Sequence, residues 1–331
     1  ARRETYAKPA ALPTVEVSSL KEDLIRRDFT VNAMAASLNE DDFGRLVDLF
    51  GGVNDLEQRS IKALHDKSFI DDPTRILRAI RFEQRLGFSI EPHTVALIRK
   101  SIGKEIYKRV EEPRLRDEIM LVLKEKEPFH IIKRMDEFRG LKIVHPYLKL
   151  HKNLGRTFTA IDEACSWYND NSPRKRSIEK WLIYLMALFD DISHDGTLYF
   201  CNKFELKRGE RLRMISYKKF SGKVLKTLNA RRKILPSKIY RLLEPLSHEA
   251  TLLLMAVSRS GLGKGRIMEF FHKYNGMRTA VKGDDIKALG VKAGPYFARI
   301  MEKILYKRLD GILKTREEEL EYAKKLAKRR L

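Results

Sequence analysis

Residues 71–88 read DDPTRILRAIRFEQRLGF, and they mark one helix of the predicted fold more clearly than any other part of the chain. Asp72 precedes Pro73 as an N-cap residue precedes a first-turn proline. Gly87 stands where a C′ glycine commonly ends a helix. Apolar residues recur at intervals of three and four between these two signals, so the stretch predicts a helix about four turns long.

Arginines recur at intervals of three along this predicted helix, at Arg75, Arg78 and Arg81, and wind a basic stripe along one side of it. Asp72 and Arg75 can project together as a carboxylate acceptor beside a planar donor fork. Such a pair matches the amino group and the neighbouring ring acceptor of cytosine or adenine, whereas uracil and guanine present the opposite pattern. Two hypotheses stay open: the segment selects a nucleobase, or Asp72 only caps the helix and Arg75 pairs with that cap.

A second basic phrase lies upstream, at residues 23–35, and reads DLIRRDFTVNAMA. Two adjacent arginines, Arg26 and Arg27, stand directly before Asp28, and an amide follows at Asn32. Guanidinium groups stay charged and offer paired donors that match phosphate oxygens, so the phrase suits a triphosphate and a ribose. The alternative is that these arginines pair only with aspartates of the same phrase.

A third phrase, DLFGGVNDL at residues 48–56, places two glycines between acidic residues. A glycine pair can cradle phosphate, but the freedom of glycine at positive φ is a sufficient reason for it. We therefore predict a strand-to-helix turn or a hinge here.

The rest of the pattern predicts a chain that is mostly helical after residue 70. Strand-like stretches rich in β-branched residues are confined to the first fifty residues, around 14–17 and 46–49. The chain therefore reads as the end of an α/β unit followed by a helical array. Apolar residues recur with helical spacing in the segments 70–86, 94–102, 115–123, 178–189, 250–257 and 298–309.

The chain has 331 residues and a formal net charge of +22, which attracts polyanions, nucleic acid being the commonest. Residues 1–126 hold 23 basic and 22 acidic side chains, and residues 127–331 hold 44 and 23. We interpret the densest block as a surface that contacts RNA or DNA phosphates, rather than as a solvated helix face. That block, residues 203–241, holds 14 Lys or Arg against two acidic residues, with aromatic side chains at Phe204, Tyr217, Phe220 and Tyr240.

Composition and cysteine content exclude several protein classes. With 43% hydrophobic and 34% charged residues the chain is expected to fold, and no apolar run approaches the roughly 20 residues that span a bilayer. The start does not resemble a signal peptide, so we expect a cytoplasmic location and no membrane partner. Cys165 and Cys201 form no C-x-x-C pair, which leaves oxygen ligands for any metal. The chain opens at Ala1 without Met and inside a charged phrase, so we expect a fragment.

Three phrases resemble the class II tRNA nucleotidyltransferase and poly(A) polymerase family in order and in spacing. They are R-R-D-F-T-x-N-A-M, D-x-x-G-G-x-x-D-L and D-D-P-T-R-I-L-R-A-I-R-F-x-x-R-L-G-F, and they span residues 23–88. The resemblance implies an α+β, predominantly α-helical protein with a partial nucleotidyltransferase (polymerase-β-like) head before all-helical domains. The implied boundaries are 1–62 for the head, 63–126 for a neck with the nucleotide-selecting helix, 127–244 for a basic body and 245–331 for a tail that binds tRNA.

The resemblance also implies template-independent addition of CMP and AMP, as CCA or as a terminal A, to the 3′ end of tRNA. The implied partners are the tRNA acceptor end, ATP and CTP, and the alternative activity within the family is poly(A) synthesis. Asp72 and Arg75 would select the base. Arg78, Arg81 and, from the head, Arg27 would hold the triphosphate.

The sequence departs from the family pattern where catalysis needs carboxylates. The family uses an Asp-x-Asp pair and a third carboxylate to hold two Mg²⁺ ions, which activate the tRNA 3′-hydroxyl and steady the leaving pyrophosphate. No Asp-x-Asp occurs in this chain, and the nearest spacing, Glu40 to Asp42, follows the arginine phrase instead of preceding it. We therefore expect the Mg²⁺ ligands upstream of Ala1, no catalytic or metal-binding residue in the chain, and no activity from the chain alone. Asp71 is a smaller departure, because the family more often has Glu there.

Two other hypotheses compete with this one. Asp190-Asp191 follows an apolar helix as the core of a metal-dependent HD-type phosphohydrolase would, and His194-Asp195 lies just beyond, but nothing shows the further His and Asp ligands in place. The other hypothesis is a non-catalytic RNA-binding fragment.

A weaker family match lies in the predicted tail, at residues 283–296. The pattern reads as a helix, a glycine turn and a new helix start near Pro295, where backbone N–H groups can meet an RNA phosphate. Plain packing of a helical hairpin is the alternative.

Overall fold

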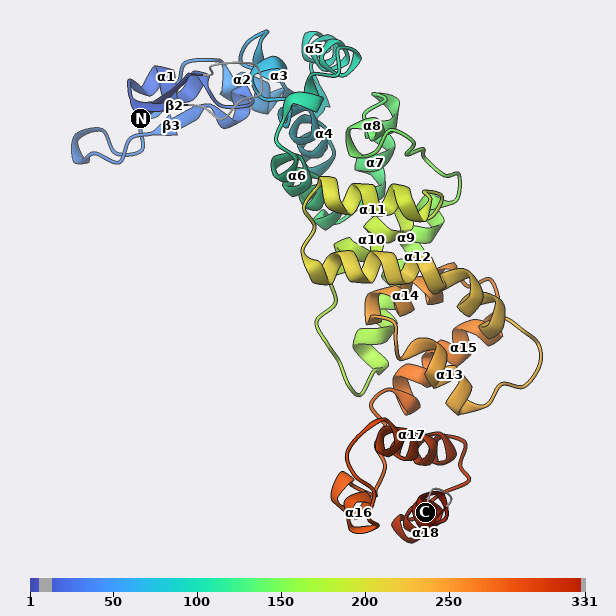
Figure 1. Ribbon diagram of the computed structural model, residues 1–331. Helices are drawn as coiled ribbons and strands as arrows, with labels where there is room; N and C mark the ends of the chain where they lie inside the picture. The colour runs from blue at the N-terminus through green and yellow to red at the C-terminus, as the bar shows by residue number, and fades with distance from the viewer. Residues whose placement is uncertain (6–13, 329–331) are drawn as a thin grey trace. The chain divides into compact units, whose positions relative to one another are not determined.

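The computed structural model describes residues 1–5 and 14–328 (Figure 1). The chain divides into two compact units. The first unit comprises Ala1–Gly155 and Leu188–Arg211, and the second comprises Arg156–Ala187 and Leu212–Leu331. The fold is α+β and predominantly α-helical, as the sequence predicts. The finer division into head, neck, body and tail stays a prediction.

Among the described residues, strands occur only in the first unit, and each pairs with one partner. The predicted strands near residues 14–17 and 46–49 are confirmed, but the prediction that strands are confined to the first fifty residues is wrong. A parallel pair lies further along, and its two-residue strands are too short to leave an alternating pattern in the sequence. The pairs are β1 (Arg2–Thr5) with β2 (Thr14–Val17) and β3 (Met34–Ala36) with β4 (Leu46–Asp48), both antiparallel, and β5 (Ser60–Ile61) with β6 (Ser89–Ile90), parallel.

Helix α4 (Arg75–Leu86) organises the first unit, because it packs against both α6 and α7. Its apolar side chains Ile76, Leu77 and Ile80 are fully buried, and Phe82 meets Phe29 edge to face with ring centroids 6.0 Å apart. The other helices of this unit are α1 (Leu20–Ile25), α2 (Gly52–Glu57), α3 (Ser68–Asp71), α5 (Pro92–Gly103), α6 (Glu112–Lys124), α7 (Pro128–Glu137), α8 (Leu141–Val144) and α11 (His194–Lys203), with 3₁₀ turns at Thr30–Asn32, Glu40–Asp42 and Ile106–Arg109.

The start of α4 differs from the prediction, while its end agrees with it. Gly87 ends the helix with a φ of 66° in the left-handed region, as predicted. Asp72 is not the N-cap residue, because the short helix α3 ends beside it and Asp72 takes an extended conformation as the C-cap of α3. Its carboxylate accepts hydrogen bonds from the backbone N–H and the hydroxyl of Thr74, at 3.1 and 2.6 Å. The carboxylate therefore stands a short turn ahead of α4 instead of capping it.

The double glycine forms the predicted turn between a strand and a helix. Gly51 has a φ of 76°, and Gly52 begins α2. The Asp48 carboxylate accepts backbone N–H bonds from Gly52 and Val53, both at 2.9 Å. These bonds, that of Val53 first, lower the pKa of Asp48 against the opposing effect of burial. The phrase is therefore explained by local structure.

The second unit is built from helices and contains a separate small core near its C-terminal end. Val281, Ile286, Ile300 and Ile304 form that core with residues of α18. The predicted helix, glycine turn and helix of residues 283–296 is confirmed by α16, by Gly290 with a φ of 79°, and by α17. The helices are α13 (Pro236–Leu243), α14 (His248–Val257), α15 (Gly261–Glu269), a π-helical segment (Phe270–Tyr274), α16 (Gly283–Ala288), α17 (Pro295–Leu309) and α18 (Arg316–Lys328), and α9 (Leu154–Asn171), α10 (Lys180–Leu188) and α12 (Arg208–Leu228) run across the division of the chain.

The remaining helical predictions are confirmed, since α5, α6, α10, α14 and α17 cover the segments with helical spacing. Within the described ranges, no helix has both the length and the apolar character to cross a membrane. Cys165 and Cys201 are both buried, and burial raises the pKa of each thiol to about 11. Both side chains therefore stay protonated at neutral pH and serve the packing of the interior.

The close approach at Gly52 gives a test of this fold. A Cβ atom on Gly52 would lie 2.4 Å from the backbone oxygen of Thr30 and 2.9 Å from Met34 Cγ. We expect Gly52→Ala to lower the free energy of unfolding by about 1–3 kcal/mol, because the turn must shift to admit the methyl group. Urea denaturation followed by circular dichroism measures the change. Gly103→Ala is the control, because a Cβ there meets no described atom within 4 Å, and equal stability of the two variants would contradict the packing of this turn.

Candidate nucleotide-binding site

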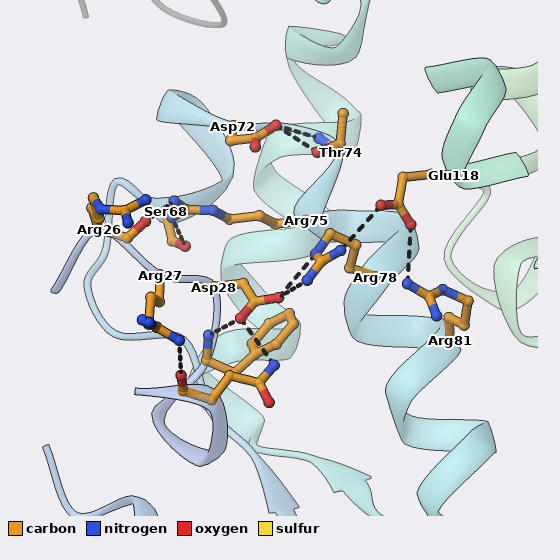
Figure 2. Close-up of polar contacts among 12 residues, drawn as sticks. Arg26, Arg27, Asp28, Ser68, Asp72, Thr74, Arg75, Arg78, Arg81 and Glu118 are labelled. Carbon is orange, nitrogen blue, oxygen red and sulfur yellow. Dashed lines mark hydrogen bonds and ion pairs between the residues drawn. The ribbon is translucent and has the colours of Figure 1, made fainter. Parts of the chain in front are cut away.

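The basic phrase of residues 23–35 and helix α4 meet in one network of charged side chains (Figure 2). The Arg78 guanidinium donates from Nε and Nη2 to Asp28 Oδ2, at 2.9 and 2.5 Å. Its Nη1 donates to Glu118 Oε1 on α6, at 3.2 Å. Asp28 is 7% exposed and also accepts hydrogen bonds from the following backbone N–H and from the Asn32 amide. Arg78, which lies on α4, therefore joins this helix to both the basic phrase and α6.

The charge of Arg78 is stabilised by these carboxylates. Partial burial of its guanidinium opposes the charged form, but Asp28 and Glu118 outweigh that effect and raise the pKa of Arg78 above its ordinary value. The side chain is still 31% exposed. Its three hydrogen bonds to carboxylates use three of the five guanidinium N–H groups, so Arg78 can donate to a phosphate through the remaining two, against the repulsion of its two carboxylates.

Arg75 makes a second link between the same segments. It is 5% exposed, and its Nη1 donates to Ser68 Oγ at 2.7 Å. Its Nη2 donates to the backbone carbonyl oxygen of Arg26 at 2.5 Å. Figure 2 shows this guanidinium reaching Ser68 and Arg26. Recognition of a base by Arg75 therefore requires it to exchange one of these partners for the base.

Asp72 lies close by in sequence but has different partners. Besides its two hydrogen bonds from Thr74, it forms an ion pair through Oδ2 with Arg114 Nη2 on α6, at 2.8 Å. Within residues 1–5 and 14–328, no hydrogen bond or ion pair joins Asp72 to Arg75. The alternative in which Arg75 simply pairs with the cap is therefore wrong for this conformation. A carboxylate has about four acceptor positions, so Asp72 keeps capacity for a base amino group.

Arg81 is the most enclosed part of the basic stripe. Its side chain is 6% exposed and forms ion pairs with Glu118 Oε2 at 3.4 Å and with Glu125 Oε1 at 3.3 Å. Its guanidinium also lies 5.0 Å from the ring centroid of Phe82, and its Nε has no hydrogen-bond partner among the described residues. These interactions hold α4 against α6, and the predicted binding of a triphosphate by Arg81 stays a prediction.

Arg27 is the most exposed of the four predicted nucleotide-binding arginines. Its side chain is 43% exposed, and it contacts the Asn32 carbonyl oxygen at 3.1 Å and Asp23 Oδ2 at 3.5 Å. The neighbouring Arg26 instead binds Asp23 through two nitrogens, at 3.1 and 2.7 Å. Pairing within the phrase therefore accounts for Arg26 but leaves much of Arg27 open to an anion.

No set of residues in the described ranges fits a metal centre. Residues 1–5 and 14–328 contain no group of three or more His, Cys, Asp or Glu side chains that could hold a metal ion. Glu40–Asp42 forms an exposed 3₁₀ turn, in which Asp42 accepts a hydrogen bond from Ser37. His194 pairs with the adjacent Asp195 at the exposed start of α11. These residues therefore supply neither a two-Mg²⁺ site nor the ligands of an HD-type phosphohydrolase.

The basic block of residues 203–241 is a mixed surface. Phe204 and Tyr217 are buried in the protein interior, so they pack within cores and cannot stack on bases. Phe220 is 41% exposed, and Lys219 Nζ lies 5.4 Å from its ring centroid. Of these aromatic residues, Phe204 and Tyr217 are therefore core residues, whereas Phe220 is exposed beside the Lys219 ammonium group.

Comparison with known proteins places these features in a family. The model of the "Poly A polymerase head domain" matches residues 1–62, and that of the "Probable RNA and SrmB-binding site of polymerase A" matches residues 87–151. A solved structure of a CCA-adding enzyme, apo form II, has a TM-score of 0.81 and 32% sequence identity, and the match covers 97% of this chain and 74% of that one. The chain belongs to the class II tRNA nucleotidyltransferase and poly(A) polymerase family.

Two more members of the family resemble the chain over most of its length. The Thermotoga maritima CCA-adding enzyme, solved in complex with tRNA(CCA), has a TM-score of 0.76 and 32% identity over 92% of this chain and 73% of its own. The A-adding tRNA nucleotidyltransferase of Geobacter sulfurreducens is 38% identical over 330 residues, which is 98% of this chain. The chain spans 37% of the length of that curated relative.

Sequence reasoning missed the carboxylate and arginine that α6 supplies to the site. Arg114 binds Asp72, and Glu118 binds both Arg78 and Arg81. The signal that could have found them is their spacing of four residues in E-P-R-L-R-D-E, which places both on one face of a helix. Asp28 lies within the basic phrase, but its ion pair with Arg78 spans 50 residues and leaves no local pattern.

The role of Glu118 can be tested by removing its charge. Glu118 is 8% exposed, so Glu118→Gln leaves two arginines short of a buried carboxylate. We expect a loss of about 1.5–5 kcal/mol in the free energy of unfolding. The matched control is Asp117→Asn on the same helix, because Asp117 is exposed and should change stability by less than about 0.5 kcal/mol. Equal urea midpoints for the two variants would show that Glu118 does not hold this network.

Proposed function

We propose that this chain selects the nucleotide and binds the RNA in the template-independent addition of AMP to the 3′ end of tRNA. The observation that carries the proposal is a pair of contacts from α4 to the basic phrase, from Arg78 to the Asp28 carboxylate and from Arg75 to the Arg26 carbonyl oxygen. A-addition is favoured over CCA-addition and poly(A) synthesis because the A-adding relative is 38% identical to this chain, against 32% for the two CCA-adding enzymes. A tRNA substrate is consistent with the expected cytoplasmic location.

We assign base selection to Asp72 and Arg75. The Asp72 carboxylate would accept a hydrogen bond from the exocyclic amino group of adenine or cytosine, and Arg75 would donate to the neighbouring ring acceptor. Arg75 reaches a base by exchanging the Arg26 carbonyl oxygen or Ser68, both of which are neutral partners. Uracil and guanine present a carbonyl oxygen where the carboxylate needs a donor, so they are disfavoured.

We assign triphosphate binding first to Arg27 and second to Arg78. Arg27 is exposed and has one neutral and one distant charged partner, so a phosphate competes with little. Arg78 can donate to a phosphate through the two N–H groups that do not bind Asp28 or Glu118, but the like charge of those carboxylates opposes a phosphate. Arg81, with two carboxylate partners and little exposure, contributes by fixing α4 against α6.

Chemistry in this family depends on Mg²⁺ held by carboxylates, which activates the attacking hydroxyl and stabilises the leaving group. The residues described do not fit such a site, so the roles proposed for them are selection, binding and positioning. That observation also favours a second candidate function, an RNA-binding module without catalysis of its own. Competition of unlabelled ATP and GTP against labelled ATP for the chain separates the two functions, since an RNA-binding module without nucleotide selection shows no preference for ATP.

Substitution of Arg75 tests base selection. We expect the wild-type chain to bind ATP and CTP more tightly than GTP and UTP, because a bidentate contact discriminates by about 1–3 kcal/mol. Arg75→Ala should reduce that preference severalfold and leave tRNA affinity within about twofold, since Arg75 is not expected to bind an RNA phosphate. Competition of each nucleotide against labelled ATP measures the preference. Arg85→Ala is the control, because Arg85 lies on the same helix but is 55% exposed. Unchanged nucleotide selectivity in Arg75→Ala would overturn the assignment.

Substitution of the basic block tests RNA binding. We expect the combined Lys218→Ala, Lys219→Ala, Arg231→Ala and Arg232→Ala variant to bind tRNA more weakly. The slope of log affinity against log salt concentration should flatten by about one unit for each phosphate that the variant no longer neutralises. Filter binding at several salt concentrations gives that slope. The control is the double variant Lys100→Ala with Lys104→Ala, which changes cations on α5 and just after it, in the near-neutral part of the chain. This control should leave the slope unchanged. An unaltered slope in the block variant would show that the block faces solvent.

A further inference from the structure

A cavity of about 560 Å³ lies in the second unit, and none of the residues of the candidate nucleotide-binding site lines it. Helices α13 and α17 pack together and line it with Tyr240 and Tyr306, and the connecting segment 277–283 closes one side. Met301 and Leu305 of α17 supply an apolar wall. Both tyrosine rings are half-buried, so part of each is accessible from the cavity or from solvent.

Two cations stand at the rim of this cavity. Arg278 and Lys282 line it from segment 277–283, and both are exposed. Two carboxylates, Glu244 and Glu302, line it from the helices and their ends. Glu302 accepts a hydrogen bond from the hydroxyl of Tyr306, which fixes the tyrosine ring beside it. The cavity therefore combines aromatic rings and an apolar wall with exposed side chains of both charges, two cations and two carboxylates.

The segment that carries the two cations is held in place by a buried carboxylate. Glu319 is 0% exposed, accepts the backbone N–H of Val281 at 2.8 Å and pairs with Arg308. The hydroxyl of Thr279 donates to the Val281 carbonyl oxygen at 2.8 Å, and the Lys282 N–H donates to Asp285 Oδ2 at 2.8 Å. An irregular segment without such anchors would lose conformational entropy on binding a ligand, whereas this one is ordered beforehand.

The ring of Tyr306 is fixed from a second direction. The Arg241 guanidinium lies 5.2 Å from its centroid, within the range of a cation–π contact. Burial, and after it the hydrogen bond to Glu302, raises the pKa of Tyr306 to about 12, so the ring stays neutral at physiological pH. A neutral aromatic ring held by a cation and a carboxylate is a suitable platform for another flat ring.

We infer that this cavity binds one unstacked nucleobase of the RNA, with an adjoining phosphate on Arg278 and Lys282. Stacking on aromatic rings beside basic side chains is how proteins hold unpaired nucleotides. The carboxylates favour a base with an exocyclic amino group, adenine, cytosine or guanine, over uracil, because a carboxylate can only accept. This inference rests on the proposed function for its ligand, an RNA substrate, and adds a binding site distinct from the nucleotide-selecting residues of α4.

The experiment uses the full chain and an unmodified tRNA transcript, with affinity measured at several salt concentrations. We expect Tyr306→Leu to weaken binding about tenfold with no change in salt slope, because it removes a stacking platform and no charge. Tyr306→Phe keeps the ring and should bind as the wild type does. Arg278→Ala with Lys282→Ala should weaken binding and flatten the slope by about 0.7–0.9 for each phosphate that is no longer neutralised.

The matched control is Arg299→Ala with Lys303→Ala, two exposed cations of α17 that do not line the cavity. Wild-type affinity for Tyr306→Leu, or an equal change of slope in the control, would overturn the inference while leaving the proposed function intact. A wild-type chain that binds no tRNA would instead contradict the proposed function.

A second measurement covers the case in which Tyr306→Leu does not fold. Transcripts containing 8-azidoadenosine can be photocross-linked to the wild-type chain and the linked peptides identified by mass spectrometry. We expect linked peptides that contain Tyr240, Tyr306 or residues 277–283. Cross-links confined to other parts of the chain would contradict the base-binding cavity.

Discussion

The site of the first unit depends on one constraint: the guanidinium of Arg78 must be shared between two carboxylates from distant parts of the sequence. Asp28 approaches from the basic phrase and Glu118 from α6. Both carboxylates are largely buried, so neither can be left without its cation at low cost. This requirement fixes the phrase, α4 and α6 relative to one another, and it places Arg75 within reach of the Arg26 carbonyl oxygen. The residues proposed to select the nucleotide are thus positioned by ion pairs in addition to apolar packing.

Local features of this arrangement could be predicted from the sequence, and long-range ones could not. The helix of residues 75–86, its end at Gly87 and the turn at the double glycine follow from spacing and backbone preference. The predicted start of that helix is wrong because Asp72 serves the preceding short helix, which an apolar pattern of four residues does not reveal. The partners of Asp72 and Arg75 were also beyond prediction, because Arg114 and Ser68 lie 42 and 7 residues away and only the folded chain brings them in.

The structure relates the uneven distribution of charge along the chain to the partners of the charged side chains. In the near-neutral part, Arg78 and Arg81 of α4 pair with carboxylates, so a negatively charged ligand meets opposing charge there. In the basic part, cations such as Lys219 and Arg278 are exposed and suit a polyanion of many phosphates. The proposed function needs both parts, one for the nucleotide and one for the RNA.

The central claim is that Asp28 and Arg78 act as one unit that assembles the site. A double-mutant cycle with Asp28→Asn, Arg78→Gln and the combined variant, read out as the free energy of unfolding in urea, measures that coupling directly. The account predicts a coupling energy of at least about 1 kcal/mol, because each single change already removes the ion pair between a largely buried carboxylate and its cation. Additive effects, within about 0.3–0.5 kcal/mol, would contradict it and show that the phrase and α4 are held together by other interactions.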